Sequence, residues 1–167
     1  MPVYTAPTRD YKFVLHDVLN MSQYGNLPGF ADADADTVDA ILEEAAKVSE
    51  QVLAPLNRIG DTQGCTRHDD GSVTTPEGFK DAYTQFAEAG WMGLSQPQEY
   101  GGQGLPQVLG LATGEMTSSA NMAFGMYPGL TGGAVRALLA GGSEAQKQMY
   151  LPKMISGEWS GTMNLTE

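Results

Sequence analysis

The sequence predicts an all-α fold, and three observations support that prediction. Apolar residues recur at intervals of three and four along several segments, which is the spacing of one helical face. Prolines and glycines stand where those segments begin and end, as helix boundaries favour. The alternation typical of a strand occurs only in residues 159–167, at the end of the chain. We therefore expect five or more helices, followed by one extended segment.

The first two helices are expected in residues 11–19 and 36–52. The first has apolar residues Tyr11, Val14, Leu15, Val18 and Leu19 on one face, and the second has Val38, Ile41, Leu42, Ala45, Val48 and Val52. Pro55 is expected to end or kink the second helix, because an internal proline loses a hydrogen bond and clashes with the preceding turn. The polar, glycine-punctuated residues 60–75 predict an irregular surface loop.

A helix after that loop should begin with Thr75 as N-cap and Pro76 in its first position, and it should stop at Gly90. Its apolar face contains Phe79, Ala82, Tyr83, Phe86 and Ala87.

Three more segments of helical spacing follow. One has its face at Leu105, Val108, Leu109, Ala112 and Met116, and another ends at Ala134, Val135, Leu138 and Leu139 before Gly141 and Gly142. Ser143 and Gln146 form a capping box that opens the last helix, which Pro152 is expected to interrupt. Residues 89–135 contain only two charged side chains, so we expect this stretch to be buried.

Composition excludes several classes of protein. The 167 residues fit one domain, and nine basic against twenty acidic residues give a net charge of −11, which disfavours binding to nucleic acid. A hydrophobic fraction of 41% is too high for a disordered acidic tail, and its apolar runs are too interrupted for a membrane span. The single cysteine, Cys65, forms no internal disulfide, and no targeting segment is visible, so we expect a cytoplasmic protein.

Isolated polar motifs point to structure rather than chemistry. Cys65, His68, Asp69 and Asp70 are too few and too acidic for a zinc site, and His16 has no partner pattern for catalysis. The glycines of residues 100–105, YGGQGL, lack the lysine of a phosphate-binding loop and predict a tight turn with positive φ. Met116, Met122 and Met126 fit core packing better than a ligand cavity.

Three signatures in a fixed order resemble the acyl-CoA dehydrogenase family. They are the turn QPQEYGGQG at residues 96–104 after a Gly-Trp stretch, the helix start GSEAQK at 142–147, and LTE at 165–167. The N-terminal stretch and the loop GCTRHDDGSVTTPEGFKDAY are similar to the larger members of the family, which include the dehydrogenases acting on 3-methylthiopropanoyl-CoA. The resemblance spans almost the whole chain.

This resemblance implies a domain plan. Residues 1–35 would be an N-terminal extension, 36–158 the helical N-terminal domain, and 159–167 the first strand of a middle β-barrel domain. That domain and the C-terminal helical bundle would be missing, so the chain is expected to be truncated. The family's glutamate base lies in that bundle, so no catalytic residue is expected here and the chain alone should be inactive.

The resemblance also implies a function and a site. The complete protein would be an FAD enzyme that desaturates an acyl-CoA between Cα and Cβ and passes electrons to an electron-transferring flavoprotein, and it would be a homo-oligomer. Met163, Leu165 and Thr166 would contact FAD, and Phe124, Tyr127 and Gly129 would face the acyl group. No metal ligand is expected.

One alternative of another class remains open from the sequence. A non-catalytic helical module that docks to a partner subunit through an exposed apolar face would have the same composition. Tightly bound flavin, visible as a yellow protein, would favour the enzyme.

Overall fold

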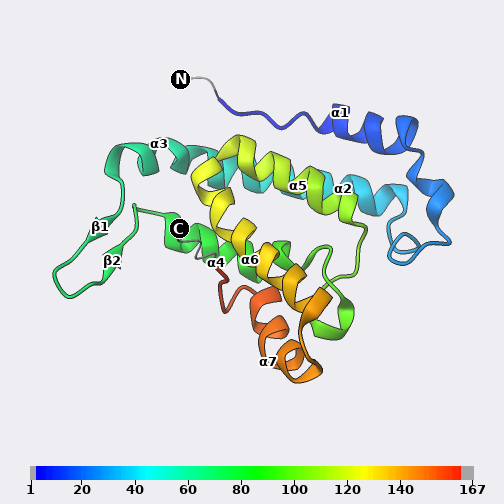
Figure 1. The fold of residues 1–167 in the computed structure, drawn as a ribbon. Coiled ribbons are helices and arrows are strands. Elements are labelled where there is room, and N and C mark those ends of the chain that lie inside the picture. Colours follow the sequence, from blue (N-terminus) through cyan, green and yellow to red (C-terminus); the bar gives the residue numbers. More distant parts are fainter. Residues whose placement is uncertain (1–2, 163–167) are drawn as a thin grey trace, which may run out of the picture.

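The computed structural model describes residues 3–162 and confirms the all-α fold (Figure 1). Its helices are α1 (Thr8–Lys12), α2 (Ala35–Lys47), α3 (Ala54–Gln63), α4 (Phe79–Glu88), α5 (Gln107–Ala120), α6 (Met122–Gly141) and α7 (Glu144–Ile155). Helices α2 and α5 lie side by side, and α6 runs from the end of α5 toward α7 (Figure 1). The core follows from that arrangement, because Leu42 of α2 and Leu109 and Met116 of α5 are fully buried in one cluster.

Pro55 does not end the helical run, contrary to one of the two expectations for it. Helical backbone runs on from α2 through a π-helical segment, Val48–Leu53, into α3, where Pro55 stands in the first turn. A proline is tolerated there, because the wider π-helical turn before it does not need the backbone N–H that proline lacks. The run ends at Gly64, whose φ is +63°.

The prediction of an irregular loop at residues 60–75 is also wrong. Its first residues complete α3, and two short antiparallel strands follow, β1 (Thr66–Arg67) and β2 (Val73–Thr74). The turn between them suits a hairpin, because the Asp70 carboxylate accepts a 2.9 Å bond from the Ser72 N–H and Gly71 has a φ of +84°. Hydrogen bonds between near neighbours therefore give a regular structure to a stretch whose polarity predicted an irregular loop.

Two helix boundaries differ from those expected. Helix α4 begins at Phe79 rather than at Pro76, because Gly78 adopts a left-handed conformation with a φ of +83° just before it. Helix α7 continues through Pro152 to Ile155, since Leu151, Met154 and Ile155 are all buried and their packing offsets the missing hydrogen bond. The capping box of Ser143 and Gln146 is confirmed.

The N-terminal residues pack against α2 and α5 and contribute to their core. Ala6, Leu15, Met21 and Ala33 are buried in the cluster that contains Leu42 and Met116. The expected helix at 11–19 is present as α1 and a π-helical segment, Phe13–Val18, but of its apolar face only Leu15 is buried, and Val18 is 60% exposed. Polar contacts hold the segment: Lys12 Nζ lies 2.9 Å from Asp39 Oδ2 and 2.7 Å from Glu43 Oε1.

Long-range contacts join α4 to the segment that follows α7. The Tyr83 hydroxyl of α4 donates a 3.0 Å hydrogen bond to the Gly157 carbonyl just after α7. Gly157 has a φ of +82°, and a Cβ there would lie 2.8 Å from Ala87 Cβ, so this close approach requires glycine. The turn thereby ties α4 to the end of α7.

The uncharged stretch 89–135 is only partly buried, contrary to expectation. Its exposed large apolar side chains are Leu111, Met122, Met126, Tyr127 and Leu130. The absence of charge therefore reflects an apolar surface on α5 and α6 that the described part of the chain leaves uncovered. Residues 159–162 form no strand, and residues 163–167 lie outside the described part. Among the described helices, none is long and apolar enough to cross a membrane.

Candidate functional site

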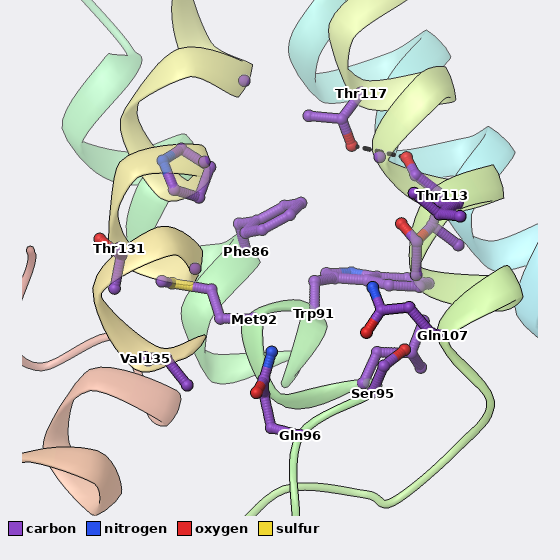
Figure 2. Close-up of a pocket in the computed structure, with 18 of the residues that line it drawn as sticks. Phe86, Trp91, Met92, Ser95, Gln96, Gln107, Thr113, Thr117, Thr131 and Val135 are labelled. Atoms are coloured by element: carbon purple, nitrogen blue, oxygen red, sulfur yellow. Dashed lines mark hydrogen bonds between the residues drawn. The ribbon is translucent and has the colours of Figure 1, made fainter. Parts of the chain in front are cut away.

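The candidate site is a cavity of about 420 Å³ between α5 and α6. Helix α5 forms one wall and α6 the other, while residues 91–96 and the end of α7 close the bottom (Figure 2). Side chains of Phe86, Trp91 and Met92 lie between the two helices (Figure 2). A volume of this size falls within the range of small-molecule sites.

The walls are mainly apolar or lack side chains. Five of the lining residues are glycines, and the apolar side chains include Leu111 on α5 and Val135 on α6. The glycines are Gly110 and Gly114 on α5 and Gly125, Gly129 and Gly132 on α6. Glu115 and Arg136 are the charged residues among those that line the cavity.

Threonine hydroxyls in the walls are already paired. Thr113 donates a 3.0 Å hydrogen bond to the Leu109 carbonyl, and Thr117 donates one of equal length to the Thr113 carbonyl (Figure 2). On α6, the Thr131 hydroxyl accepts a 3.2 Å bond from the Gly161 N–H. Paired hydroxyls cost little beside an apolar ligand, so these threonines do not oppose an acyl chain.

The floor of the cavity is fixed by the glycine turn that follows it. Residues 93–96 pair with 103–105, since the N–H groups of Gln103 and Gly104 donate 2.9 Å bonds to the carbonyls of Gly93 and Gln96. Gly101 and Gly104 have φ values of +89° and +69°, and a Cβ on Gly102 would lie 2.1 Å from the Gln96 oxygen. The YGGQGL motif therefore forms the tight turn expected of it.

Trp91 occupies the centre of this floor. Its indole Nε1 is buried and has no hydrogen-bond partner among the described residues, and its ring lies 6.4 Å from that of Phe86. In Figure 2 the indole extends from the floor toward α5. The aromatic pair limits the depth of the cavity.

The structure separates the three residues that the sequence suggested for the acyl group. Gly129 lines the cavity. Phe124 is buried behind the lining, with its ring 5.4 Å from that of Phe86. Tyr127 instead contacts Tyr83 with a ring separation of 5.1 Å, and its hydroxyl donates a 2.9 Å bond to Ser160 Oγ.

Sequence reasoning missed most of the lining. The glycine pairs Gly110 and Gly114, and Gly125 and Gly129, each have the spacing of four that marks one helical face, and this signal was available. The floor residues 91–96 gave no such signal, because they reach α5 and α6 only through the fold. Met116 is buried in the core as expected, whereas Met122 and Met126 are exposed on α6.

The remaining sequence candidates either fall outside the described residues or are absent from the cavity lining. The FAD contacts assigned to Met163, Leu165 and Thr166 fall outside the described residues. His68 Nε2 lies 2.8 Å from Thr74 Oγ1 in the hairpin, and His16 Nε2 lies 2.8 Å from Asp39 Oδ1. In the described range, no group of three or more His, Cys, Asp or Glu side chains is placed to hold a metal ion.

The N-terminal segment approaches the rim of the cavity through Glu115. Burial and this nearby carboxylate raise the pKa of Tyr11 to about 12, and burial with Glu50 and Glu115 also raises the pKa of Tyr4. The Glu50 carboxylate accepts a 2.8 Å bond from the Ala6 N–H. The bond from Ala6 to Glu50 and the contact of Tyr11 with Glu115 thus attach residues 6–11 to the helices behind the cavity.

Comparison with known proteins places the fold in a family. The sequence profile described as "Acyl-CoA dehydrogenase, N-terminal domain" matches residues 35–158, which is most of the chain. The chain belongs to the acyl-CoA dehydrogenase family. The signatures at residues 96–104 and 142–147 therefore serve this family's fold as the glycine turn and the capped start of α7.

Two relatives in this family match nearly the whole chain. The 3-methylmercaptopropionyl-CoA dehydrogenase of Ruegeria pomeroyi is 48% identical over 98% of the chain. A butyryl-CoA dehydrogenase of Syntrophomonas wolfei is 37% identical over 98% of it. The chain spans 28% and 27% of the lengths of these two relatives.

A solved structure shares the fold. It is described as "Electron transferring flavoprotein of Acidaminococcus fermentans: Towards a mechanism of flavin-based electron bifurcation", and its chain superimposes with a TM-score of 0.59 at 25% identity. The match covers 72% of this acyl-CoA dehydrogenase family chain and 29% of the other.

Proposed function

We propose that this chain is the N-terminal helical part of an FAD-dependent acyl-CoA dehydrogenase, and that the cavity between α5 and α6 forms one side of its acyl site. The observation that carries the proposal is the cavity itself, whose walls are mainly apolar and glycine-rich, with Thr113 and Thr117 hydroxyls that are already paired. An apolar wall of this kind stabilises an acyl chain by removing it from water. The names of the two relatives, both acyl-CoA dehydrogenases, support the same reading.

The described residues fit the acyl part of this site better than the cofactor. Arg136 is the one cation among the described residues that line the cavity, whereas the diphosphate of FAD carries two negative charges. The flavin would therefore be held by Met163, Leu165 and Thr166, as the resemblance implies, together with the domains that follow in longer relatives. When bound, FAD supplies the acceptor for the hydride that leaves Cβ.

The chain's own residues have three tasks in this scheme. Leu111 and Val135 line the acyl chain, the aromatic floor of Phe86 and Trp91 ends the cavity, and the glycine turn at 101–104 holds that floor rigid. None of these side chains can remove the α proton, and the resemblance to the family implies that the base lies in the C-terminal helical bundle of longer relatives. Electrons would pass to an electron-transferring flavoprotein, and the complete protein would be a homo-oligomer.

A pair of charge insertions tests the cavity as the acyl site. Leu111 and Met122 are both exposed apolar residues of the uncharged stretch, at 66% and 59%, but only Leu111 lines the cavity. In the full-length flavoprotein, assayed with an artificial electron acceptor, Leu111→Glu should raise the KM for a long-chain acyl-CoA at least tenfold. Met122→Glu should change it less than twofold.

Two further outcomes bear on the proposal. The 167-residue chain alone should show no dehydrogenation, because the resemblance to the family places the base in the C-terminal helical bundle. A full-length protein that carries no flavin and oxidises no acyl-CoA would contradict the proposed function, and equal effects of the two insertions would remove the cavity from the acyl site.

A further inference from the structure

The segment that follows α7, residues 157–161, is attached to other helices by side-chain hydroxyl groups. Besides the bond that α4 makes to it, two hydroxyls of α6 contact this segment. The Tyr127 hydroxyl donates a 2.9 Å bond to Ser160 Oγ. The Thr131 hydroxyl accepts a 3.2 Å bond from the Gly161 N–H. The partners lie 33 and 30 residues apart, so both bonds fix the segment relative to a distant helix.

The bond between Thr131 and Gly161 is the more enclosed of these two. Thr131 is 1% exposed, whereas Tyr127 is 51% exposed. A Cβ on Gly161 would lie 2.6 Å from Ala134 Cβ and 2.9 Å from Met154 Cε, so the chain passes directly against α6 and α7 at this point. Loss of the Thr131 acceptor would leave the Gly161 N–H without this partner in a packed region, which costs more than loss of a bond at the surface.

Thr131 differs from two other threonines that line the cavity. The hydroxyls of Thr113 and Thr117 bond to carbonyls of their own helix, whereas that of Thr131 pairs with a later segment. In Figure 2 the Thr131 hydroxyl lies on the side of α6 away from Phe86. Helix formation does not favour threonine here, because it is a poorer helix former than alanine, and a buried hydroxyl is costly unless it is paired. What the hydroxyl provides is therefore the bond to Gly161.

The place of Gly161 in the sequence gives this bond a consequence for the cofactor, and this step rests on the proposed function. Met163, the first residue that would contact FAD, follows Gly161 by two positions. Two residues span at most about 7 Å of chain, so a fixed N–H at Gly161 limits where the flavin contacts can lie. Thr131 would thus act on the flavin without touching it.

We propose that Thr131 is a positioning residue for the flavin. By accepting the Gly161 N–H, it fixes the point from which the chain enters the residues that contact FAD. Because Thr131 also lines the cavity, one side chain sets the flavin contacts relative to the acyl wall. A threonine that served stability alone would leave the flavin affinity unchanged when its hydroxyl is removed.

The test compares three variants of the full-length protein. Thr131→Val keeps the shape of the side chain and removes the acceptor, while Thr131→Ser keeps the hydroxyl. Thr117→Val is the matched control, because Thr117 is a buried threonine of the same cavity whose hydroxyl bonds within α5. Three quantities are measured: amide hydrogen exchange in residues 157–162 of the flavin-free protein, the Kd and absorption spectrum of bound FAD, and the thermal unfolding temperature, which shows that each variant is folded.

Thr131→Val should speed the amide exchange and raise the Kd for FAD, each roughly three- to tenfold, the effect of about one neutral hydrogen bond. Its flavin absorption bands should also shift. Thr131→Ser and Thr117→Val should change the exchange and the Kd less than twofold. An unchanged FAD affinity in Thr131→Val, or an equal change in Thr117→Val, would overturn the inference and leave the proposed function in place. A wild-type protein that binds no FAD would instead contradict the proposed function, whatever the exchange rates.

Discussion

The side-chain amide of Asn121 donates a 3.1 Å hydrogen bond to the carbonyl of Leu53, which lies 68 residues earlier in the chain. Leu53 is the last residue of the π-helical segment before Pro55, and Asn121 is the N-cap of α6. The same side chain accepts a 3.0 Å bond from the Phe124 N–H. One fully buried amide thus starts the helix that forms a wall of the cavity and anchors it to the helical run at residues 35–63.

Replacement of Asn121 should separate these two contributions. Asn121→Ser keeps a neutral N-cap acceptor for the Phe124 N–H but loses the amide donor to Leu53, so it leaves a buried carbonyl unpaired. Asn121→Ala loses both, and it should lower the free energy of unfolding by roughly 1–3 kcal/mol for the carbonyl and by about 1 kcal/mol for the cap. Urea unfolding of the two variants measures the difference. No loss in either variant would show that neither contact matters for stability.

The glycine turn beneath the cavity should tolerate substitution at one position and not at its neighbour. A Cβ at Gly102 would lie 2.1 Å from the Gln96 carbonyl oxygen, a backbone atom that cannot move aside without opening the turn. A Cβ at Gly101 meets nothing within 4 Å, so Gly101→Ala costs only the left-handed backbone, about 1–2 kcal/mol. Gly102→Ala should therefore lower the midpoint of urea unfolding clearly more than Gly101→Ala, and the reverse order would contradict this account of the turn.

Acid should weaken the attachment of the N-terminal segment. A hydrogen bond from His16 and contacts with Lys12 hold the pKa of Asp39 below its ordinary value of 3.8. The folded state therefore prefers the ionised form, and the stability it adds is present above pH 3.8 and is lost as pH falls through the lower folded-state pKa. Because Asp39 is 38% exposed, solvent screening limits the contribution to about 0.2–1 kcal/mol.

The Asp39→Asn variant tests this point. It should lower stability slightly near neutral pH and flatten the acid limb of the stability profile measured by urea unfolding between pH 2 and 5. Glu44→Gln, which removes a carboxylate paired with Lys47 within α2 and away from the N-terminal segment, serves as the control. An acid limb unchanged by Asp39→Asn would assign the acid sensitivity to other carboxylates.

High pH should also weaken the attachment of the N-terminal segment, through ionisation of Tyr11. Its pKa is raised from 10.0 to about 12, first by burial and then by Glu115, so the folded state binds the phenolic proton more tightly than the unfolded chain does. This stability is fully present below pH 10 and is lost as pH rises from 10 to about 12. Tyr11→Phe should remove that part of the alkaline loss, whereas Tyr24→Phe, on an exposed tyrosine, should not. Unfolding measured at a series of pH values from 9 to 11.5 distinguishes the two variants.

Local patterns predicted the helices well and their junctions poorly. The faces of α2 and α5 and the capping box of α7 depend on neighbours within a few residues, and all three are as expected. The effect of Pro55 depends on the π-helical segment before it, and that of Pro152 depends on the burial of Met154 and Ile155. Both are properties of the whole fold, which the local sequence does not contain. The expectation that α6 is buried was wrong, since a stretch without charged residues can be either buried or exposed.

The candidate site was the part least accessible to sequence reasoning. Gly129 lines the cavity, whereas Tyr127, two residues earlier, contacts Tyr83 and Ser160. Residues separated by two on a helix face different directions, and the sequence segment 124–130 was treated as one surface. Trp91 and Phe86 join the cavity only because α4 and the glycine turn pack below α6.

The bond between Tyr83 and Gly157 also bears on how the protein is made. A ribosome adds roughly 5–20 residues per second, so the 74 residues between these partners take about 4–15 s to synthesise. Throughout that interval Tyr83 of α4 lacks the carbonyl that its hydroxyl binds, and Ala87 and Met92 lack the Gly157 turn that packs against them. Nascent chains arrested between these two points should therefore be good substrates for chaperones that bind exposed aromatic segments, and chains released after residue 157 should not.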